Sequence, residues 1–461
     1  MSKNNSSFGI DNVLKIITED GGRVHFLGVG GVSMASLYCL SRHFGIKCSG
    51  SDSASGEYVR LLLLADEDVF VGERESLPQD TCLLVYTLAI DENNSELLYA
   101  QRHGIPTVSR AEYMAALMSC YGERIGVSGT HGKSTVTAML ASIFETGGKN
   151  PTVLSGARLK TGAPLLIGGL DYMIFEACEY KDSFLHFSPT LSVFLNLEYD
   201  HADYFENMEA LESSFLSAIK KCNVAVINFD DPRLSRLARE SGTPYVSFSR
   251  CEGCDYSYRA EALTDTLMKI ELSHKGVMLG EILLPMRGAF NAENAVAAAT
   301  AALTLGISFS DVREALLSFR GIPRRLERVG NFLGREVYYD YAHHPSEIRE
   351  GIRAIRGNVG KCVTVIFGPH TYSRTKALWN DFIGALSEAD YVVLTEIYAA
   401  RERVDPDVSV EALAELVGGG VSRNREEILR SIKDTKGDII IMGAADMNWI
   451  LEALFPETKN P

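Results

Sequence analysis

Short apolar runs alternate along most of the chain with longer segments in which apolar residues recur every three or four positions. The short runs are typical of strands buried inside a parallel sheet, and the longer segments are typical of amphipathic helices. Their alternation predicts an α/β protein built from parallel sheets that helices cover. We expect strands at 23–27, 46–52, 82–86, 124–127, 172–177, 191–195, 224–228, 337–339, 362–367, 391–395 and 438–442.

The segments between these strands supply the expected helices, with one exception. Between 245 and 284, apolar and polar residues alternate in the manner of antiparallel strands. Elsewhere helical spacing or helix-capping residues predict helices at 34–40, 96–102, 110–120, 136–144 and 202–219, and a further helix that begins near 288.

The length and two breaks in the pattern indicate three domains. A chain of 461 residues is about three times the usual domain size. Tyr121 and Gly122 follow one predicted helix, and the segment 320–325 contains glycine and proline. We predict a Rossmann-like N-terminal domain over 1–122, a central α/β domain over 123–320 and a Rossmann-like C-terminal α/β domain over 321–461.

Charge and cysteine content narrow the functional class. The net charge of −15 argues against general nucleic-acid binding, which needs a basic surface. No apolar run reaches the length of a membrane span, and residues 1–12 lack the apolar core of a signal peptide, so we expect a cytoplasmic protein. The nine cysteines fit reduced thiols. Cys251 and Cys254 have no second pair with which to form a zinc ribbon.

The central domain opens on a candidate phosphate-binding loop. The strand 124–127 leads through glycines into Lys133, Ser134 and a helix. Glycines let backbone N–H groups face phosphate oxygens, the lysine reaches the terminal phosphates, and the serine hydroxyl can bind Mg²⁺. Val127 stands where the standard pattern has a glycine, so a glycine turn with a solvated lysine is the alternative. We favour an ATPase-like domain with a nucleotide-binding loop that comprises Gly129, Thr130, His131, Gly132, Lys133, Ser134 and Thr135.

Two strands of the same domain end in further ligand-type residues. Glu179 follows the strand 172–177, and Asp200 and His201 follow the strand 191–195. Open α/β sheets place their sites at the carboxyl ends of strands, so we expect Ser134, Glu179 and His201 to hold Mg²⁺. Alternatively, Glu179 is a solvated acid and Asp200-His201 caps the following helix.

The N-terminal domain carries a second glycine turn. Gly28, Gly30 and Gly31 follow the first predicted strand, and the second strand ends in Asp52. Such a turn can hold a pyrophosphate, as in nucleotide sugars or dinucleotides, although Ser33 replaces the third glycine of the dinucleotide pattern. A tight strand–helix turn without a ligand is equally open.

Later segments repeat the strand-end pattern. Asn291 and Asn294 share one helical face, where their amides could cap the helix or contact a base. The remaining polar clusters follow predicted strands of the C-terminal domain, and their members are Asp340, Tyr341, His343, His344, His370 and Arg374.

Taken in order, these motifs resemble those of the Mur ligases, the ATP-dependent amide ligases of peptidoglycan precursor synthesis. The resemblance covers nearly the whole chain. Its carriers are Gly129–Thr135, Glu179, Asn196-x-Glu-x-Asp-His201, Asn291-x-x-Asn294 and Asp340-Tyr-Ala-His343. The glycine turn at 28–34, His343-His344-Pro345 and Pro369-His370-x-Tyr372-Ser-Arg374 are most similar to the branch that adds L-alanine. Like that branch, the chain has Phe215 where later enzymes carry a carbamylated lysine. Residues that depart from the branch are Ser33, Phe290, Tyr339 and Thr371.

The resemblance implies an acid–amino-acid ligase that uses ATP and Mg²⁺. It would join L-alanine to the carboxylate of UDP-N-acetylmuramate through an acyl phosphate, a step that supports cell wall biogenesis, cell shape and cell division. Domain closure would precede the chemistry. The implied catalytic residues are Lys133, Glu179, His201, His343 and Arg374. Asn291 and Asn294 would contact adenine and Asp340 the ribose. The implied substrate residues are Gly28, Gly30, Gly31, Ser33, Asp52, Arg110, Tyr341, His344 and His370.

Three other functions stay open at this point. The first is a related ligase that adds another amino acid or a preformed peptide, because small side chains are hard to discriminate by sequence. The second is a catalytically silent nucleotide-sugar-binding relative, which the departures suggest. The third is a nicotinamide-dependent oxidoreductase, which the turn at Gly28 suggests and Ser33 disfavours.

Overall fold

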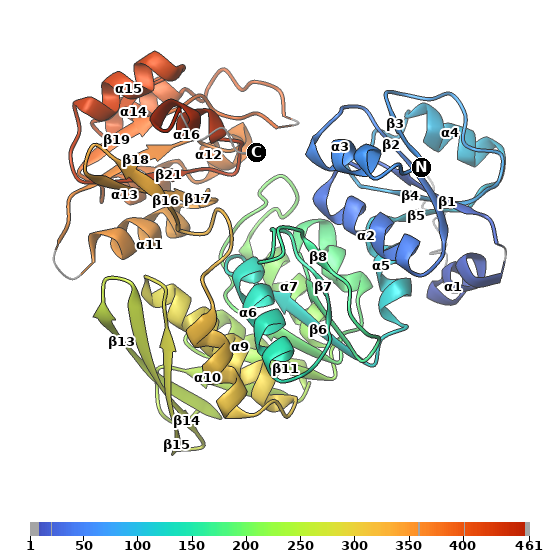
Figure 1. Cartoon of the computed structure of the whole chain (residues 1–461), viewed down its shortest axis with the longest axis horizontal. Coiled ribbons are helices and arrows are strands. Elements are labelled where there is room, and N and C mark those ends of the chain that lie inside the picture. Colours follow the sequence, from blue (N-terminus) through green and yellow to red (C-terminus); the bar gives the residue numbers. More distant parts are fainter. Residues whose placement is uncertain (1–8, 20, 358–359, 401, 457–461) are drawn as a thin grey trace.

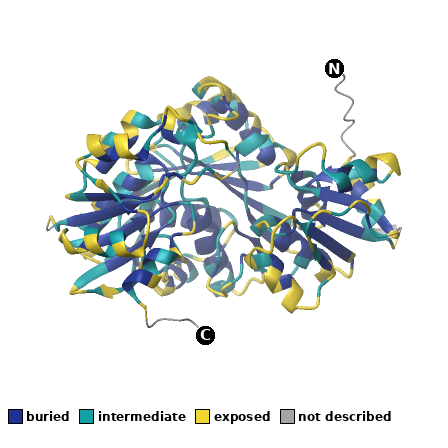
Figure 2. Ribbon diagram, turned by 90° about the horizontal axis from the view of Figure 1, so that it is seen from above, coloured by how far each residue is buried: buried dark blue, intermediate teal, exposed yellow. Residues whose placement is uncertain are grey.

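A computed structural model describes residues 9–19, 21–357, 360–400 and 402–456. Three sheets, each with its own helices, form three domains along the chain (Figure 1). In that view the N-terminal domain is blue, the middle domain lies below and is green to yellow, and the C-terminal domain is orange to red. The strands at the centre of each sheet are buried, and exposed residues lie mainly on the outer helices and loops (Figure 2).

The N-terminal sheet has five parallel strands in the order β3-β2-β1-β4-β5. This Rossmann-type order places the first strand at the centre, where the chain switches direction and leaves a crevice at the carboxyl ends. The elements are α1 (Ile10–Glu19), β1 (Arg23–Leu27), α2 (Val32–His43), β2 (Lys47–Asp52), α3 (Glu57–Leu64), β3 (Val69–Val71), β4 (Thr81–Tyr86), α4 (Ser95–Arg102), β5 (Thr107–Ser109) and α5 (Arg110–Met118).

The middle sheet has ten strands in the order β15-β14-β13-β12-β11-β10-β6-β9-β7-β8. Neighbours from β13 to β7 are parallel, and the pairs at both ends are antiparallel. The elements are β6 (Glu123–Ser128), α6 (Lys133–Thr146), β7 (Thr152–Leu154), β8 (Leu165–Leu166), β9 (Tyr172–Glu176), η1 (Tyr180–His186), β10 (Leu191–Phe194), α7 (Met208–Ile219), β11 (Val224–Asn228), α8 (Pro232–Ser241), β12 (Tyr245–Ser249), β13 (Tyr256–Thr264), β14 (Leu267–His274), β15 (Val277–Leu284), α9 (Ala289–Thr304) and α10 (Phe309–Ser318).

The C-terminal sheet has six strands in the order β16-β17-β21-β18-β19-β20, and only β16 is antiparallel to its neighbour. The elements are β16 (Glu327–Phe332), β17 (Arg335–Asp340), α11 (Pro345–Arg356), β18 (Val363–Phe367), α12 (Tyr372–Ala377), α13 (Trp379–Leu386), β19 (Tyr391–Leu394), α14 (Val410–Leu416), β20 (Gly420–Val421), α15 (Arg425–Lys433), β21 (Asp438–Met442) and α16 (Asn448–Leu454).

The apolar cores do not follow the three domains: the N-terminal and middle domains share one core, and the C-terminal domain has its own. α6, α9 and α10 cover one face of the middle sheet. The other face carries η1, α7 and α8, and their side chains share one continuous core with the N-terminal domain, from Tyr113 through Phe184 to Phe215. The C-terminal domain has two cores of its own, around Phe367 and Ile441. Burial of apolar surface therefore ties the first two domains together and leaves the third as a separate body.

The α/β class and the parallel sheets predicted from the sequence are confirmed. Two details are wrong. β12, which the alternation placed among antiparallel strands, is parallel to β11. The helix predicted over 202–219 begins only at Met208, because Asn207 caps it by accepting a hydrogen bond from Ala210 N, and His201 lies in the left-handed region at φ 57°. None of the helices in the described part of the chain is both long and apolar enough to cross a membrane.

Candidate active site between the middle and C-terminal domains

The glycine-rich loop joins β6 to α6 at the carboxyl edge of the middle sheet. Gly132 caps α6 in the left-handed region at φ 84°, and a Cβ there would lie 2.5 Å from Asn294 Oδ1. Asn196 holds the loop from the side: its Oδ1 accepts from His131 N at 2.8 Å, and its Nδ2 donates to His131 O at 3.2 Å. The loop is therefore a preorganised turn in front of a helix N-terminus, a geometry suited to phosphate.

Lys133, the first residue of α6, meets the carboxylate at the end of the neighbouring strand. Its Nζ lies 3.1 Å from Glu179 Oε2 and also donates to Thr130 O at 3.2 Å. Burial lowers the pKa of Lys133, but the Glu179 carboxylate outweighs this and the pKa is raised. The lysine is therefore charged beside the loop, where a polyphosphate would need it.

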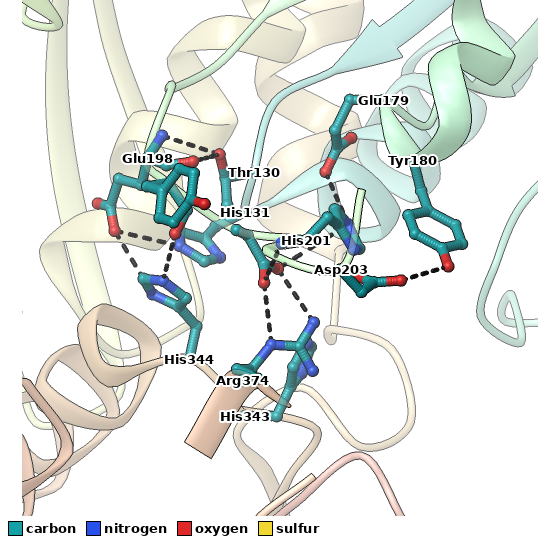
Figure 3. Close-up of polar contacts among 12 residues, drawn as sticks. Thr130, His131, Glu179, Tyr180, Glu198, His201, Asp203, His343, His344 and Arg374 are labelled. Atoms are coloured by element: carbon teal, nitrogen blue, oxygen red, sulfur yellow. Dashed lines mark hydrogen bonds and ion pairs between the residues drawn. The ribbon is translucent and has the colours of Figure 1, made fainter. Parts of the chain in front are cut away.

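Glu179, which follows β9, also contacts His201, which follows β10 on the other side of β6. The side chain of Glu179 is only 3% exposed, and its Oε1 lies 3.4 Å from His201 Nε2 (Figure 3). Burial raises the pKa of Glu179, and Lys133 and His201 more than reverse this, so the pKa is lowered. Ser134 lies in the first turn of α6 and is buried. The ionised, buried Glu179 carboxylate supplies the oxygen ligand that a hard divalent cation prefers, and the His201 imidazole lies 3.4 Å from it.

Arg374 crosses from the C-terminal domain to Asp200 in the middle domain. Its Nε and Nη2 lie 2.9 and 3.2 Å from the two carboxylate oxygens of Asp200, and the side chains of Arg374 and Asp200 are 10% and 8% exposed. Burial raises the pKa of Asp200, but Arg374 reverses this and lowers it well below the usual range. A bidentate, nearly buried ion pair therefore links the two domains at the edge of the site.

A second polar bridge joins the domains at His131. Its Nδ1 lies 3.1 Å from Glu347 Oε1 of α11, and its Nε2 lies 3.4 Å from Glu198 Oε2. Burial lowers the pKa of His131, but the two carboxylates raise it to about 9. The imidazolium thus lies between carboxylates of both domains.

Two histidines of the C-terminal domain, His343 and His370, have lowered pKa values, in contrast to His131. His343 Nδ1 lies 3.0 Å from Tyr341 O, and His370 Nδ1 lies 3.0 Å from Arg374 Nη1. Burial lowers the pKa of His343 to about 4, although Glu347 opposes it. Burial and then Arg374 lower the pKa of His370 to about 4. Both rings are neutral at physiological pH and act as polar surfaces that do not repel a cationic ligand.

A cavity of about 440 Å³ opens where the middle domain meets the linker and the C-terminal sheet. Asn291 lines it, with its Nδ2 donating to Arg287 O at 2.8 Å, whereas Asn294 lies against Gly132. Asp340 is buried near this region, and burial raises its pKa to about 7 against the opposing charge of Arg325.

Sequence reasoning missed three residues of this region. Arg325, which it placed in the linker, lines the cavity, stacks over the Tyr341 ring and lies 3.7 Å from Glu347. Glu347 and Glu198 contact His131 from opposite domains. Only Glu198 had a signal, its place in the motif that ends at His201; Glu347 sits in an ordinary helix start.

The N-terminal candidates lie apart, at the carboxyl edge of the first sheet. Gly28 has φ 83°, and Gly30 N donates to Asp52 Oδ2 at 2.9 Å, so the acid closes the glycine turn. Ser33 lies in the first turn of α2, beyond Gly31. Arg110 begins α5 beside Cys178, burial lowers its pKa, and its guanidinium has no acidic partner among the described residues. That cation faces the boundary with the middle domain, where an anionic substrate would compensate it.

Known proteins are similar in sequence to this chain over nearly its whole length. Three family models match in order: Mur ligase family, catalytic domain, at residues 23–121; Mur ligase middle domain at 127–302; and Mur ligase, glutamate ligase domain, at 324–445. The UDP-N-acetylmuramate–L-alanine ligase of Caldicellulosiruptor bescii is 36% identical over 93% of this chain and 97% of its own length. The enzyme of the same name from Aquifex aeolicus is 34% identical over 94% and 97%.

Solved structures superpose on this chain over nearly its whole length. The UDP-N-acetylmuramate–alanine ligase of Thermotoga maritima superposes with a TM-score of 0.79 at 25% identity, covering 94% of this chain and 98% of that one. A murein peptide ligase from Psychrobacter arcticus has the same fold, with a TM-score of 0.68 at 22% identity over 94% and 98%. The chain belongs to the Mur ligase family.

Proposed function

We propose that the protein joins the amino group of L-alanine to the carboxylate of UDP-N-acetylmuramate at the expense of ATP. The observation that carries this is the phosphate-binding loop with Lys133 and Glu179, in a chain that aligns over its full set of domains with ligases of that name. ATP is the phosphoryl donor, since a free carboxylate has no leaving group that an amine can displace.

The loop and Lys133 bind the ATP phosphates in this proposal. Backbone N–H groups and the α6 N-terminus attract the phosphate oxygens, and Lys133 exchanges its contact with Glu179 for one with the terminal phosphate. Ser134, Glu179 and His201 would hold Mg²⁺, which supplies positive charge to offset the charge of the phosphates. Asn291, Asn294 and Asp340 bind the nucleoside beside the cavity.

The nucleotide sugar occupies the N-terminal crevice. The turn from Gly28 to Ser33, with Asp52 behind it, receives the UDP part, and Arg110 directs the anionic substrate toward the middle domain. This partition places the phosphoryl acceptor, which is the carboxylate of the nucleotide sugar, and the phosphoryl donor ATP on different domains.

Arg374 is positioned for the carboxylate of the amino acid. Asp200 occupies the edge formed by Nε and Nη2, and His370 faces Nη1. A guanidinium carries five N–H groups, so one on Nη1 and one on Nη2 remain to grip a second carboxylate. Tyr341, His343 and His370 follow one another by ring contacts on the side of Arg374, and the neutral rings of His343 and His370 leave the incoming amine unrepelled. His344 faces Glu198 instead.

The deciding experiment measures phosphate release from ATP with UDP-N-acetylmuramate and a panel of acceptors: L-alanine, glycine, L-serine and the natural tripeptide. We expect the highest kcat/KM with L-alanine, and no release without the sugar nucleotide. Turnover with the peptide alone would assign the chain to the peptide-ligase branch. Absence of turnover with every acceptor, in protein that still binds the sugar nucleotide, would make it a silent relative.

A further inference from the structure

Three candidate metal ligands converge from both sides of the domain boundary. His131 lies in the phosphate-binding loop, Glu198 follows β10, and His344 is the N-cap of α11 in the C-terminal domain. His131 Nε2 and His344 Nδ1 lie 3.4 and 3.5 Å from the same oxygen, Glu198 Oε2 (Figure 3). One ligand atom from each residue lies within 4.8 Å of the other two. Tetrahedral Zn²⁺, with bonds of about 2.0–2.2 Å, holds its ligand atoms about 3.3–3.5 Å apart.

The far side of each imidazole is already oriented. His131 Nδ1 lies 3.1 Å from Glu347 Oε1, and His344 Nε2 lies 3.3 Å from Tyr199 O. Metal-binding histidines characteristically donate their second N–H to a carboxylate or a backbone carbonyl, which aims the other nitrogen at the ion. Both rings here have that partner, and both place the remaining nitrogen within 3.5 Å of Glu198 Oε2. In His344 that nitrogen also accepts the helix-capping hydrogen bond of Ser346 N at 3.4 Å, which a bound ion replaces.

A small polar group stands between the ligands. Ser346 Oγ lies 2.9 Å from His131 Nε2 and 2.8 Å from His344 Nδ1. The hydroxyl is a neutral oxygen at hydrogen-bond distance from both nitrogens, and it is available as a fourth ligand when an ion replaces these two hydrogen bonds. Two carboxylates, Glu198 and Glu347, face this cluster, together with Arg325 at 3.7 Å from Glu347 and the protonated His131 ring. A divalent cation at His131 Nε2 takes the place of the proton on that nitrogen, so both carboxylates then compensate the ion.

We propose that His131, Glu198 and His344, completed by Ser346, bind one divalent transition-metal ion and thereby clamp the middle domain to the C-terminal domain. Two imidazoles and one carboxylate favour Zn²⁺ or Co²⁺ over Mg²⁺, which prefers oxygen ligands. The site shares no residue with the proposed magnesium ligands Ser134, Glu179 and His201. Because the ligands come from two domains, a bound ion holds the arrangement seen here.

The test uses the full chain, stripped of metal by a chelator and free of nucleotide, with Co²⁺ as the probe. Tetrahedral Co²⁺ gives an intense visible absorption band, and calorimetry gives the number of ions and their affinity. The Cys251→Ser/Cys254→Ser protein serves as the background, because it removes the one Cys-x-x-Cys thiol pair that could compete for the ion. We expect one Co²⁺ per chain with a tetrahedral spectrum.

One variant from each domain tests the bridge. Glu198→Gln changes a partly exposed side chain, and His344→Asn keeps a residue that caps helices well. Each should weaken Co²⁺ binding by more than about a hundredfold, and Glu347→Gln by about 10- to 100-fold through His131. His201→Asn and the exposed His103→Asn are matched controls that should keep the band and the affinity.

Two outcomes would overturn the proposal. If the wild-type chain takes up no Co²⁺, there is no site. If the band survives His344→Asn but disappears in His201→Asn, the ion occupies the magnesium position and does not bridge the domains. Neither outcome depends on ligase activity, so the proposed function would stand or fall separately.

Discussion

At the residue scale, the site is governed by charged side chains whose partners lie in another segment. Lys133 is neutralised by Glu179, Arg374 by Asp200, and His131 by two carboxylates. Apart from the partly exposed Glu198, these side chains are largely shielded from water. Removing one member of such a pair therefore leaves its partner uncompensated, which costs more than losing a surface pair. Two predictions follow from individual groups.

The first concerns Arg374→Ala. If Arg374 grips the amino-acid carboxylate, the loss costs about 2–4 kcal/mol, or roughly thirty- to a thousand-fold in kcat/KM for L-alanine, with little change for ATP. Asp200→Asn provides the matched comparison, since it breaks the same ion pair but keeps the guanidinium. Lys376→Ala, which removes an exposed pair with Asp405, is the neutral control. Equal losses in Arg374→Ala and Asp200→Asn would reduce Arg374 to a link between the domains.

The second concerns the pH dependence of stability at Asp340. Burial raises its folded pKa to about 7, above the value of about 3.9 in an unfolded chain. Between these values the folded state binds a proton that the unfolded state releases, so Asp340 lowers the free energy of unfolding as pH rises from about 4 to about 7. The free energy of unfolding of Asp340→Asn, relative to that of the wild type, should therefore increase by about 2–4 kcal/mol as the pH rises from 4 to 8.

Urea unfolding at the two pH values measures this difference, with the exposed Asp171→Asn as a control. A wild type and an Asp340→Asn protein that change in parallel with pH would show that the carboxyl is ionised throughout. That result would also mean that Asp340 faces the nucleoside as an ionised carboxylate.

At the element scale, the loop between β6 and α6 depends on backbone conformation more than on side chains. Gly132 and Gly148 both have positive φ, at 84° and 68°, one at each end of α6. A Cβ on Gly132 meets Asn294 Oδ1 at 2.5 Å, whereas a Cβ on Gly148 meets nothing within 4 Å. Alanine at Gly148 therefore introduces backbone strain alone, whereas alanine at Gly132 introduces the same kind of strain and also a clash with α9.

We predict that Gly148→Ala costs about 1–2 kcal/mol of stability, the strain of a left-handed alanine, and leaves ATP binding unchanged. Gly132→Ala adds the clash, so it should lose more stability and weaken ATP binding at least about tenfold. Thermal unfolding and nucleotide titration measure the two effects. Adding Asn294→Ala to Gly132→Ala should recover part of the stability, and the absence of any recovery would exclude the clash as the cause.

At the scale of the whole molecule, the three domains are joined in two ways. One apolar core runs through the N-terminal and middle domains. The C-terminal domain has its own cores and meets the middle domain through polar pairs such as Asp200–Arg374, His131–Glu347 and Asp265–Lys361. Polar contacts of this kind separate at lower cost than an apolar core, which suits a domain that closes over its substrates.

Calorimetry of the full chain should accordingly show two unfolding transitions, one for the N-terminal and middle domains together and one for the C-terminal domain. Asp200→Asn should shift the C-terminal transition relative to the other, because it weakens the joint without touching either core. A single cooperative transition that keeps its shape in this variant would show that the polar joint couples the domains as strongly as the core does.

Features that depend on neighbours along the chain can be predicted from the sequence. The sequence predicted that the glycine loop, Lys133, Glu179 and His201 lie near one another, because each belongs to a segment that follows a strand and parallel strands bring their carboxyl ends to one edge. The family and the α/β class followed from the order of such motifs.

The tertiary structure alone decided which charges meet. Arg374 and Asp200 are 174 residues apart, and no local pattern distinguishes that pairing from one with a nearby acid. Arg325 and Glu347 looked like a linker cation and a helix-start acid, and they became part of the site only because the C-terminal domain packs against the phosphate-binding loop. Periodicity reports what is buried and which edge of a sheet a residue reaches, whereas contacts between domains depend on how separately folded bodies come to rest on one another.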